Sequence, residues 1–353
     1  MILKSMTLSL LIIIFYMNSV NANCLGFGAG ERLENFCLLN AINGKTLDHD
    51  SAKIIDVRLR RVGRSTGLGI YIPQTKNMGN SFFSSSLKPL IRYEDNINGG
   101  NPAKPLIIGN LSFQGDEKLH KTSGFVGGLS ANLNGRTIYA QRRYLDYNLS
   151  TSYALSPASS DRIAITNLRA CSINHIKKLW FLDACFSQSQ TNKQISNNIS
   201  RGLELTTSHI FTATGQKYNH IKFGINRLFT EDYEQNQLTL SINSLYQNNI
   251  FTGLEMALGE AVPNELSTKA SLSGIVNLYL AGKPLSLSGS LRNETGGLVY
   301  GLDHDAQTVS INVSYPIRNN ITVNFGYSKT NSDIDYFDRA TPFFGLQFSA
   351  VQF

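Results

Sequence analysis

Apolar residues fall on every second position toward the end of this chain. Two consecutive runs show the pattern, with polar residues between the apolar ones: Val309, Ile311, Val313 and Tyr315, then Ile321, Val323, Phe325 and Tyr327. A period of two is typical of β-strands that have one apolar and one polar face. The short segment Pro316–Asn320 joins the two runs and predicts a hairpin turn.

The chain ends in a further predicted strand, Pro342–Phe353. It resembles the closing strand of bacterial outer-membrane β-barrels, in which a terminal aromatic residue such as Phe353 belongs to the assembly signal. Its apolar positions change parity along the strand: Phe344, Leu346 and Phe348, then Val351. One inserted residue exchanges the two faces of a strand, so we expect a bulge near Ser349 or Ala350. The alternative is an edge strand of a soluble sandwich.

Strand-like segments of similar length follow one another from Phe83 onward. After a first strand that begins at Phe83, the candidates are Gly124–Leu133, Tyr144–Leu155, Arg162–Cys171, Leu179–Phe186, Gly202–Phe211, His220–Phe229, Leu238–Tyr246, Phe251–Leu258, Ala270–Leu280 and Leu285–Leu291. With the last three strands they make fourteen, within a range of 12 to 16, because Arg136–Arg143 is a candidate for an extra strand. Lengths of 8 to 12 residues match tilted strands that cross a bilayer.

The spacing of these strands predicts the fold. Short turns such as Ala281–Pro284 alternate with longer polar loops: Thr230–Gln237, Asn293–Ala306 and Thr330–Thr341. We expect an all-β protein whose residues 82–353 form a transmembrane antiparallel up-and-down β-barrel, with short turns in the periplasm and long loops outside. Leu106–Phe113, within the first long loop, fits either a strand or a loop hairpin.

The residues before the barrel predict export. Residues 1–22 contain a single Lys, an apolar run from Leu8 to Tyr16 and a small-residue cleavage site, as in a secretory signal peptide. A lipid-anchored Cys24 is disfavoured, because Asn21 and Asn23 do not resemble a lipobox. Residues 23–81 are near the lower size limit for an independent core, so we expect this small segment to pack on the periplasmic end of the barrel or enter its lumen.

The four cysteines form two local pairs, Cys24 with Cys37 and Cys171 with Cys185. An exported chain meets an oxidising periplasm, so we predict two disulfides, each worth about 3 kcal/mol on the chain-entropy model. The second bridge depends on register. A turn centred near Lys178 places Cys171 opposite Cys185, whereas a turn near Ile176 separates them.

Composition narrows the possible functions. Charged residues make up 16% of the chain, which carries 29 Gly, 19 Phe and 15 Tyr, and this balance suits a barrel with aromatic belts. The net charge is +7, yet no Lys/Arg cluster with interleaved aromatics predicts binding to nucleic acid. No run of about eighteen apolar residues, the length that a transmembrane helix needs, occurs after the leader.

Candidate chemistry is sparse. Leu-Asp-His-Asp occurs at Leu47–Asp50 and Leu302–Asp305, but an Asp/His protease site needs a second acidic pair from another loop. We therefore predict no enzymatic activity, cofactor or metal, and interpret both segments as solvated loops. By parity, four charged residues face the lumen and predict a hydrated interior: Asp146, Glu204, Lys222 and Glu255.

Several segments resemble one known family. They are Tyr93–Asn98, Pro102, Ile108–Phe113, Ser123 with Gly124, Tyr327–Arg339 and Phe344–Leu346. They are similar to the barrel domain of the surface lipoprotein assembly modifier family, over roughly Phe83–Phe353. The resemblance implies a fourteen-stranded barrel in the outer membrane of a Gram-negative bacterium. Such a barrel contacts outer-membrane lipids and the barrel assembly machinery, and helps a partner protein reach the cell surface.

One departure from that family leaves two functional hypotheses. Family members carry an N-terminal domain of tetratricopeptide repeats that handles the partner, and no repeat of about 34 residues is visible in residues 23–81. The first hypothesis is an accessory protein for translocation or surface display. The second is a porin-like passive channel or a structural barrel.

Overall fold

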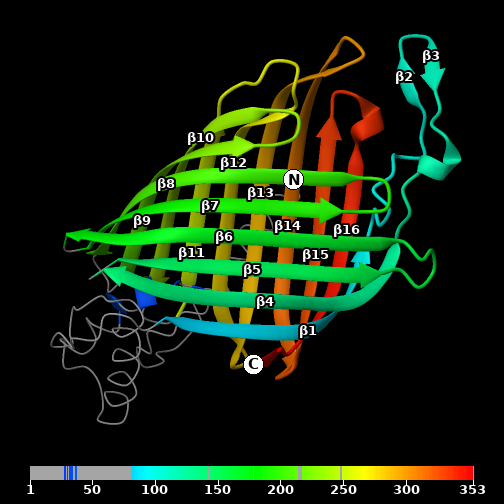
Figure 1. Ribbon diagram of the computed structural model, residues 1–353. Helices are drawn as coiled ribbons and strands as arrows, with labels where there is room; N and C mark the ends of the chain where they lie inside the picture. The colour runs from blue at the N-terminus through cyan, green and yellow to red at the C-terminus, as the bar shows by residue number, and fades with distance from the viewer. Residues whose placement is uncertain are drawn as a thin grey trace.

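The computed structural model describes residues 28, 30, 32–34, 36–37, 81–140, 143–177, 179–213, 217–246 and 249–352. Fourteen antiparallel strands close into one barrel (Figure 1). They are β1 (Phe82–Glu94), β4 (Gly124–Ala140), β5 (Arg143–Leu155), β6 (Arg162–Lys177), β7 (Trp180–Asn192), β8 (Asn197–Ala213), β9 (Lys217–Phe229), β10 (Glu234–Tyr246), β11 (Phe251–Gly259), β12 (Ser267–Leu280), β13 (Lys283–Val299), β14 (Leu302–Arg318), β15 (Ile321–Ser332) and β16 (Arg339–Phe348). Each strand pairs with its neighbour in sequence, and β16 pairs with β1. The predicted fold and strand count are confirmed.

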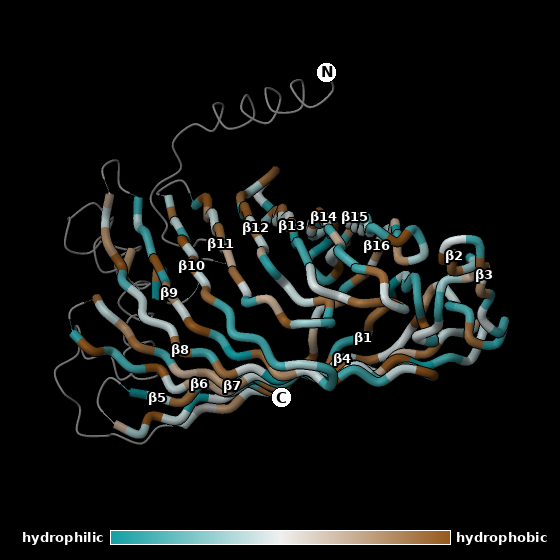
Figure 2. The backbone as a smooth tube through the Cα atoms, turned by 90° about the horizontal axis from the view of Figure 1, so that it is seen from above, coloured by the Kyte–Doolittle hydropathy of each residue, from teal (hydrophilic) through white to brown (hydrophobic). Residues whose placement is uncertain are grey.

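The alternation of residues along the strands separates the two faces of the wall. In the β14–β15 pair, Ile311 lies opposite Tyr327 on the outer face, and Ser310 lies opposite Ser328 on the inner face. Phe325, also on the outer face, is 56% exposed. Figure 2 shows apolar and polar residues alternating along the strands. The wall is therefore a single layer with an apolar outside and a polar inside.

The seam of the barrel contains the expected irregularity. Leu90 pairs with Gln347 in β16, and Leu87 pairs with Val351 in the short β17 (Val351–Gln352). These pairs are three residues apart on β1 and four residues apart on the closing strand. One extra residue is thus inserted between β16 and β17, which confirms the predicted bulge. Phe353 lies outside the described residues, so its role in assembly stays a prediction.

Several strands are longer than the sequence predicts, β13 and β14 most of all. The segment Asn293–Ala306, expected as a loop, continues β13 and β14 as a hairpin whose turn is formed by Tyr300 and Gly301. Both turn residues have positive φ, 50° and 85°, which suits a tight two-residue hairpin. The loop prediction was wrong because it looked for alternating apolar residues. A hairpin that extends beyond the membrane does not face lipid, so its strands need no such alternation. Leu302–Asp305 accordingly belongs to β14.

The structure also assigns the two segments that the sequence left ambiguous. Leu106–Phe113 is a small hairpin of β2 (Leu106–Ile108) and β3 (Leu111–Phe113), separate from the barrel sheet. Arg136–Arg143 adds no strand, because it contains the end of β4 and the start of β5. Two short 3-10 helices, η1 (Glu117–Leu119) and η2 (Asp335–Phe337), lie in the loops.

A short helical segment at residues 32–34 and 36–37 lies at the end of the barrel where β6 ends (Figure 1, blue). The predicted signal peptide lies outside the described residues, and so do residues 23–81 apart from this segment, Gly28, Gly30 and Ser81. Among the helices of the described part, none is long and apolar enough to cross a membrane.

Closure of the barrel predicts a simple gel behaviour. Every strand pairs on both sides, so the barrel has no free edge from which detergent can unravel it. We expect the unboiled protein to migrate faster than the boiled protein on a denaturing gel. Identical migration of the two samples, with the protein in the soluble periplasmic fraction, would contradict a closed membrane barrel.

Candidate functional site

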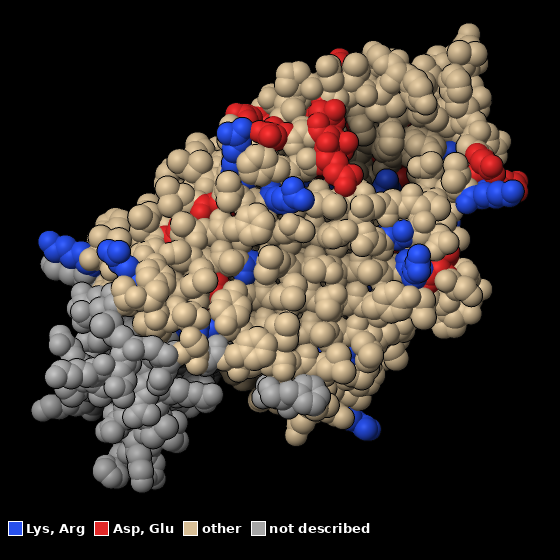
Figure 3. Space-filling model, viewed as in Figure 1, with Lys and Arg blue, Asp and Glu red and all other residues tan. Residues whose placement is uncertain are grey.

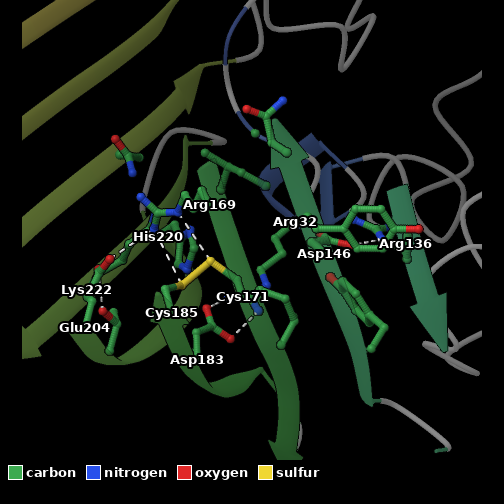
Figure 4. Close-up of a pocket in the computed structure, with 18 of the residues that line it drawn as sticks. Arg32, Arg136, Asp146, Arg169, Cys171, Asp183, Cys185, Glu204, His220 and Lys222 are labelled. Carbon is green, nitrogen blue, oxygen red and sulfur yellow. Dashed lines mark hydrogen bonds and ion pairs between the residues drawn. A yellow bond between two sulfur atoms is a disulfide. The ribbon is translucent and has the colours of Figure 1, made fainter. Parts of the chain in front are cut away.

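A cavity of about 720 Å³ lies in the lumen, against the inner faces of β4 to β9 (Figure 4). Its lining contains four basic and three acidic side chains: Arg32, Arg136, Arg169, Lys222, Asp146, Asp183 and Glu204. Charges of both signs facing one another keep an interior hydrated without a large net charge. This cavity is the candidate site.

Two ion pairs join neighbouring parts of the wall. Arg136 on β4 and Asp146 on β5 lie directly opposite each other, and the Arg136 Nη2 donates to the Asp146 Oδ2 over 2.6 Å. The Arg136 guanidinium also lies over the Tyr144 ring, 4.2 Å from its centroid. Arg169 on β6 reaches across β7, and its Nη2 lies 3.0 Å from the Glu204 Oε2. In each of these two ion pairs, the acid and the base lie on barrel strands.

The predicted disulfide between Cys171 and Cys185 forms on the lumen face. The two residues lie directly opposite each other in the β6–β7 ladder, as a turn centred near Lys178 predicts. Arg169 donates to the Cys171 Sγ over 3.2 Å and from its Nη2 to the Cys185 Sγ over 3.6 Å. Of the other predicted pair, Cys37 is disulfide-bonded, while Cys24 lies outside the described residues.

The four charged residues that parity predicted to face the lumen all line cavities. Asp146, Glu204 and Lys222 line the main cavity, and Glu255 lines a neighbouring cavity of about 310 Å³. Within the described part of the chain, the Lys222 ammonium has no ion-pair partner within 4.0 Å. Next to it on the same face, His220 is buried, and its Nε2 has no hydrogen-bond partner among the residues that the structure describes.

The N-terminal helical segment enters this cavity. The Arg32 Nη1 and Nη2 each lie 2.7 Å from an oxygen of the Asp183 carboxylate on β7. The same guanidinium lies 4.1 Å from the centroid of the Phe181 ring, and its Nη1 lies 3.4 Å from the Ser208 Oγ on β8. The ion pair therefore joins residues that are 151 positions apart in the sequence.

An apolar cluster holds the same segment against the wall. Its buried members come from the segment and from five strands: Leu33, Cys37, Phe181, Ile210, Tyr218, Leu245 and Phe251. The Phe36 ring meets the Tyr218 ring edge to face, with centroids 5.8 Å apart. At Gly28, an added Cβ would lie 2.3 Å from the Asn277 side chain on β12. The segment thus contacts wall strands from β7 to β12 and occupies part of the lumen.

The Leu-Asp-His-Asp segment of β14 forms no site with the other described residues. Leu47–Asp50 lies outside the described residues, and His304 of the other segment stacks on Phe337 of η2, with centroids 4.5 Å apart. In the described residues, no three His, Cys, Asp or Glu side chains come together as metal ligands.

The outer face of the barrel carries the exposed apolar side chains that contact with a lipid bilayer requires. Large apolar side chains are exposed along all the barrel strands, as at Leu205, Leu240 and Ile311. In Figure 3 most of the surface over β4–β8 is uncharged, with only scattered charged side chains on it. Because the closed sheet satisfies its backbone internally, this surface can face lipid. The chain is an outer-membrane β-barrel. Such barrels belong to the outer membrane of Gram-negative bacteria.

Comparison with known proteins adds only distant structural likenesses. No family model and no curated protein matches the chain. OccK9 (OpdG) of Pseudomonas aeruginosa is 10% identical, with 78% of this chain and 99% of that chain covered, at a TM-score of 0.41. OprB of Pseudomonas putida is 6% identical, with 77% and 94% covered, at a TM-score of 0.43. OccAB3 of Acinetobacter baumannii is 7% identical, with 78% and 100% covered, at a TM-score of 0.41. The resemblance to surface lipoprotein assembly modifiers stays a prediction.

Proposed function

We propose that this barrel is a porin-like channel that lets small hydrophilic solutes cross the outer membrane. The observation that carries the proposal is the cavity in the lumen, whose wall presents basic and acidic side chains from neighbouring strands. A polar solute that enters such a lumen exchanges its hydration water for these fixed charges and hydrogen-bonding groups. An apolar or plugged core would offer no such exchange.

The dimensions of the lumen favour small solutes. The cavity of about 720 Å³ falls within the range of about 300–1,000 Å³ that is usual for small-molecule sites. The segment that carries Arg32 and Leu33 narrows the passage further. An unfolded protein chain would have to displace this segment. The translocation hypothesis therefore depends on the family resemblance alone, and no contact among the described residues favours it.

Reconstitution tests the proposal. We expect the purified full chain to conduct in planar bilayers, and vesicles that contain it to swell in small sugars or amino acids but not in large oligosaccharides. Insertion is checked on the same vesicles by the migration difference between unboiled and boiled samples. Inserted, folded barrels that pass neither ions nor small solutes would contradict the proposal. Co-purification of an exported protein with such a silent barrel would favour translocation.

A further inference from the structure

The wall site that holds Arg32 is built entirely from barrel residues. Asp183 and Phe181 lie on β7, and Ser208 lies on β8. Both carboxylate oxygens of Asp183 accept from the guanidinium at 2.7 Å, the Phe181 ring lies beneath it, and the Ser208 hydroxyl lies at its edge. Arg32 itself comes from a separate segment that contributes no group to the wall.

These three groups match a guanidinium better than they match an ammonium ion. A carboxylate that accepts from two nitrogens at once fits the planar fork of a guanidinium, whereas an ammonium ion binds as a single point charge. The aromatic face beneath the cation adds a stacking contact that a planar cation uses best. With the segment in place, Phe181 and Ser208 are 4% and 2% exposed, and Phe181 belongs to the apolar cluster.

The ion pair at this site differs from the two other pairs in the cavity. Arg136 with Asp146 and Arg169 with Glu204 each join two strands of the barrel, so both partners of each pair belong to the wall. Arg32 with Asp183 instead joins the wall to a segment that lies in the lumen. A solute that carried a guanidinium group could take the place of Arg32 without any change in the barrel.

We infer that Asp183, Phe181 and Ser208 form a binding site for guanidinium-bearing solutes, and that Arg32 occupies this site as an internal ligand. The inference rests on the proposed channel function only in that the solute arrives through the lumen. While Arg32 fills the site, an external guanidinium must compete with it. The apparent affinity for the solute is therefore the affinity of the empty site multiplied by the fraction of time that Arg32 leaves the site vacant.

The segment also docks through apolar contacts that do not use the charge of Arg32. Leu33, Phe36 and Cys37 pack against Tyr218 and other residues of the apolar cluster, which includes Phe181 but not Asp183. Arg32→Gln should therefore vacate the site while the rest of the segment stays in place. Arg169→Gln is the matched control, because it removes an arginine from the same cavity, where it donates from one nitrogen to one oxygen of Glu204, and leaves Arg32 on Asp183.

Methylguanidinium is the probe, and methylammonium at equal ionic strength is the reference. We measure binding to the detergent-purified full chain by calorimetry and block of single channels in planar bilayers. Arg32→Gln is expected to bind methylguanidinium at least about tenfold more tightly than the wild type, since the internal competitor is gone. Methylammonium should show no comparable gain, and Arg169→Gln should behave like the wild type.

The second substitution decides whether Asp183 is the site. In the Arg32→Gln background, Asp183→Asn should abolish the gained affinity while the barrel keeps its heat-dependent migration. Equal methylguanidinium binding by the wild type and Arg32→Gln, or tight binding that survives Asp183→Asn, would overturn the inference. Calorimetry needs no conductance, so a barrel that binds methylguanidinium as expected but passes no current refutes the channel function and leaves the site intact.

Discussion

Gly128→Val is expected to destabilise the closed barrel strongly. Gly128 lies on the inner face of β4, opposite Ala154 of β5. A Cβ at this position would lie 1.9 Å from the carbonyl oxygen of Tyr153 and 2.7 Å from the Cα of Ala154. These are backbone atoms of the paired strand, so no side chain can move aside. We expect a loss of about 3 kcal/mol or more of folding free energy, at or above the usual upper end for an overpacked core.

The adjacent glycine provides the control. Gly127 lies on the outer face, and an added Cβ there would have no heavy atom within 4 Å. Gly127→Val should therefore change the folding free energy by no more than about 0.5 kcal/mol. Urea titration of barrels folded into phospholipid vesicles, read from the migration of unboiled samples, measures both variants. Equal stability of the two valine variants would show that the close approach of β4 and β5 is not required.

The period-two pattern predicted the wall well for a physical reason. Lipid demands an apolar residue at every outward position, so each strand carries a strong alternation where it crosses the bilayer. Beyond the bilayer that demand ends, and the pattern fades. The continuation of β4 to Ala140 and the long hairpin of β13 and β14 therefore could not be seen in the sequence, although they extend the same ladders.

The pairing register of two neighbouring strands could be predicted where the sequence held a second feature besides the apolar alternation. Cys171 and Cys185 allow a bridge only when the turn lies near Lys178, and the structure has that register. The bulge in the closing strand likewise followed from a parity change between Phe348 and Val351. A regular alternation is compatible with several pairing registers. In both cases one local feature selected a single register.

The charged site was only partly predictable. Asp146, Glu204 and Lys222 were placed in the lumen by parity, and Asp183 and Arg169 have the same parity as the two cysteines beside them. That signal could have identified Asp183 and Arg169. Arg136 lay outside the predicted part of its strand. Arg32 gave no signal, because its segment has no strand period and its partner is 151 residues away.

The largest effect expected on the lipid face comes from Ile311→Arg. Ile311 is 58% exposed and lies in the middle of the outward apolar run of β14, between Val309 and Val313. An arginine there places a charge in hydrocarbon near the middle of the bilayer, where it cannot reach water. Such substitutions on the lipid face of barrels cost about 2–4 kcal/mol near the midplane.

Ser310→Arg is the matched substitution one residue away, on the opposite face. Ser310 lines the lumen cavity of about 310 Å³ that Glu255 also lines, so an arginine there has both space and a carboxylate within the same cavity. We expect Ser310→Arg to cost less than about 1 kcal/mol, as charges on the lumen side do not enter lipid. Urea titrations of both variants in vesicles give the difference directly. A Ser310→Arg barrel that loses as much stability as Ile311→Arg would contradict the assignment of the two faces.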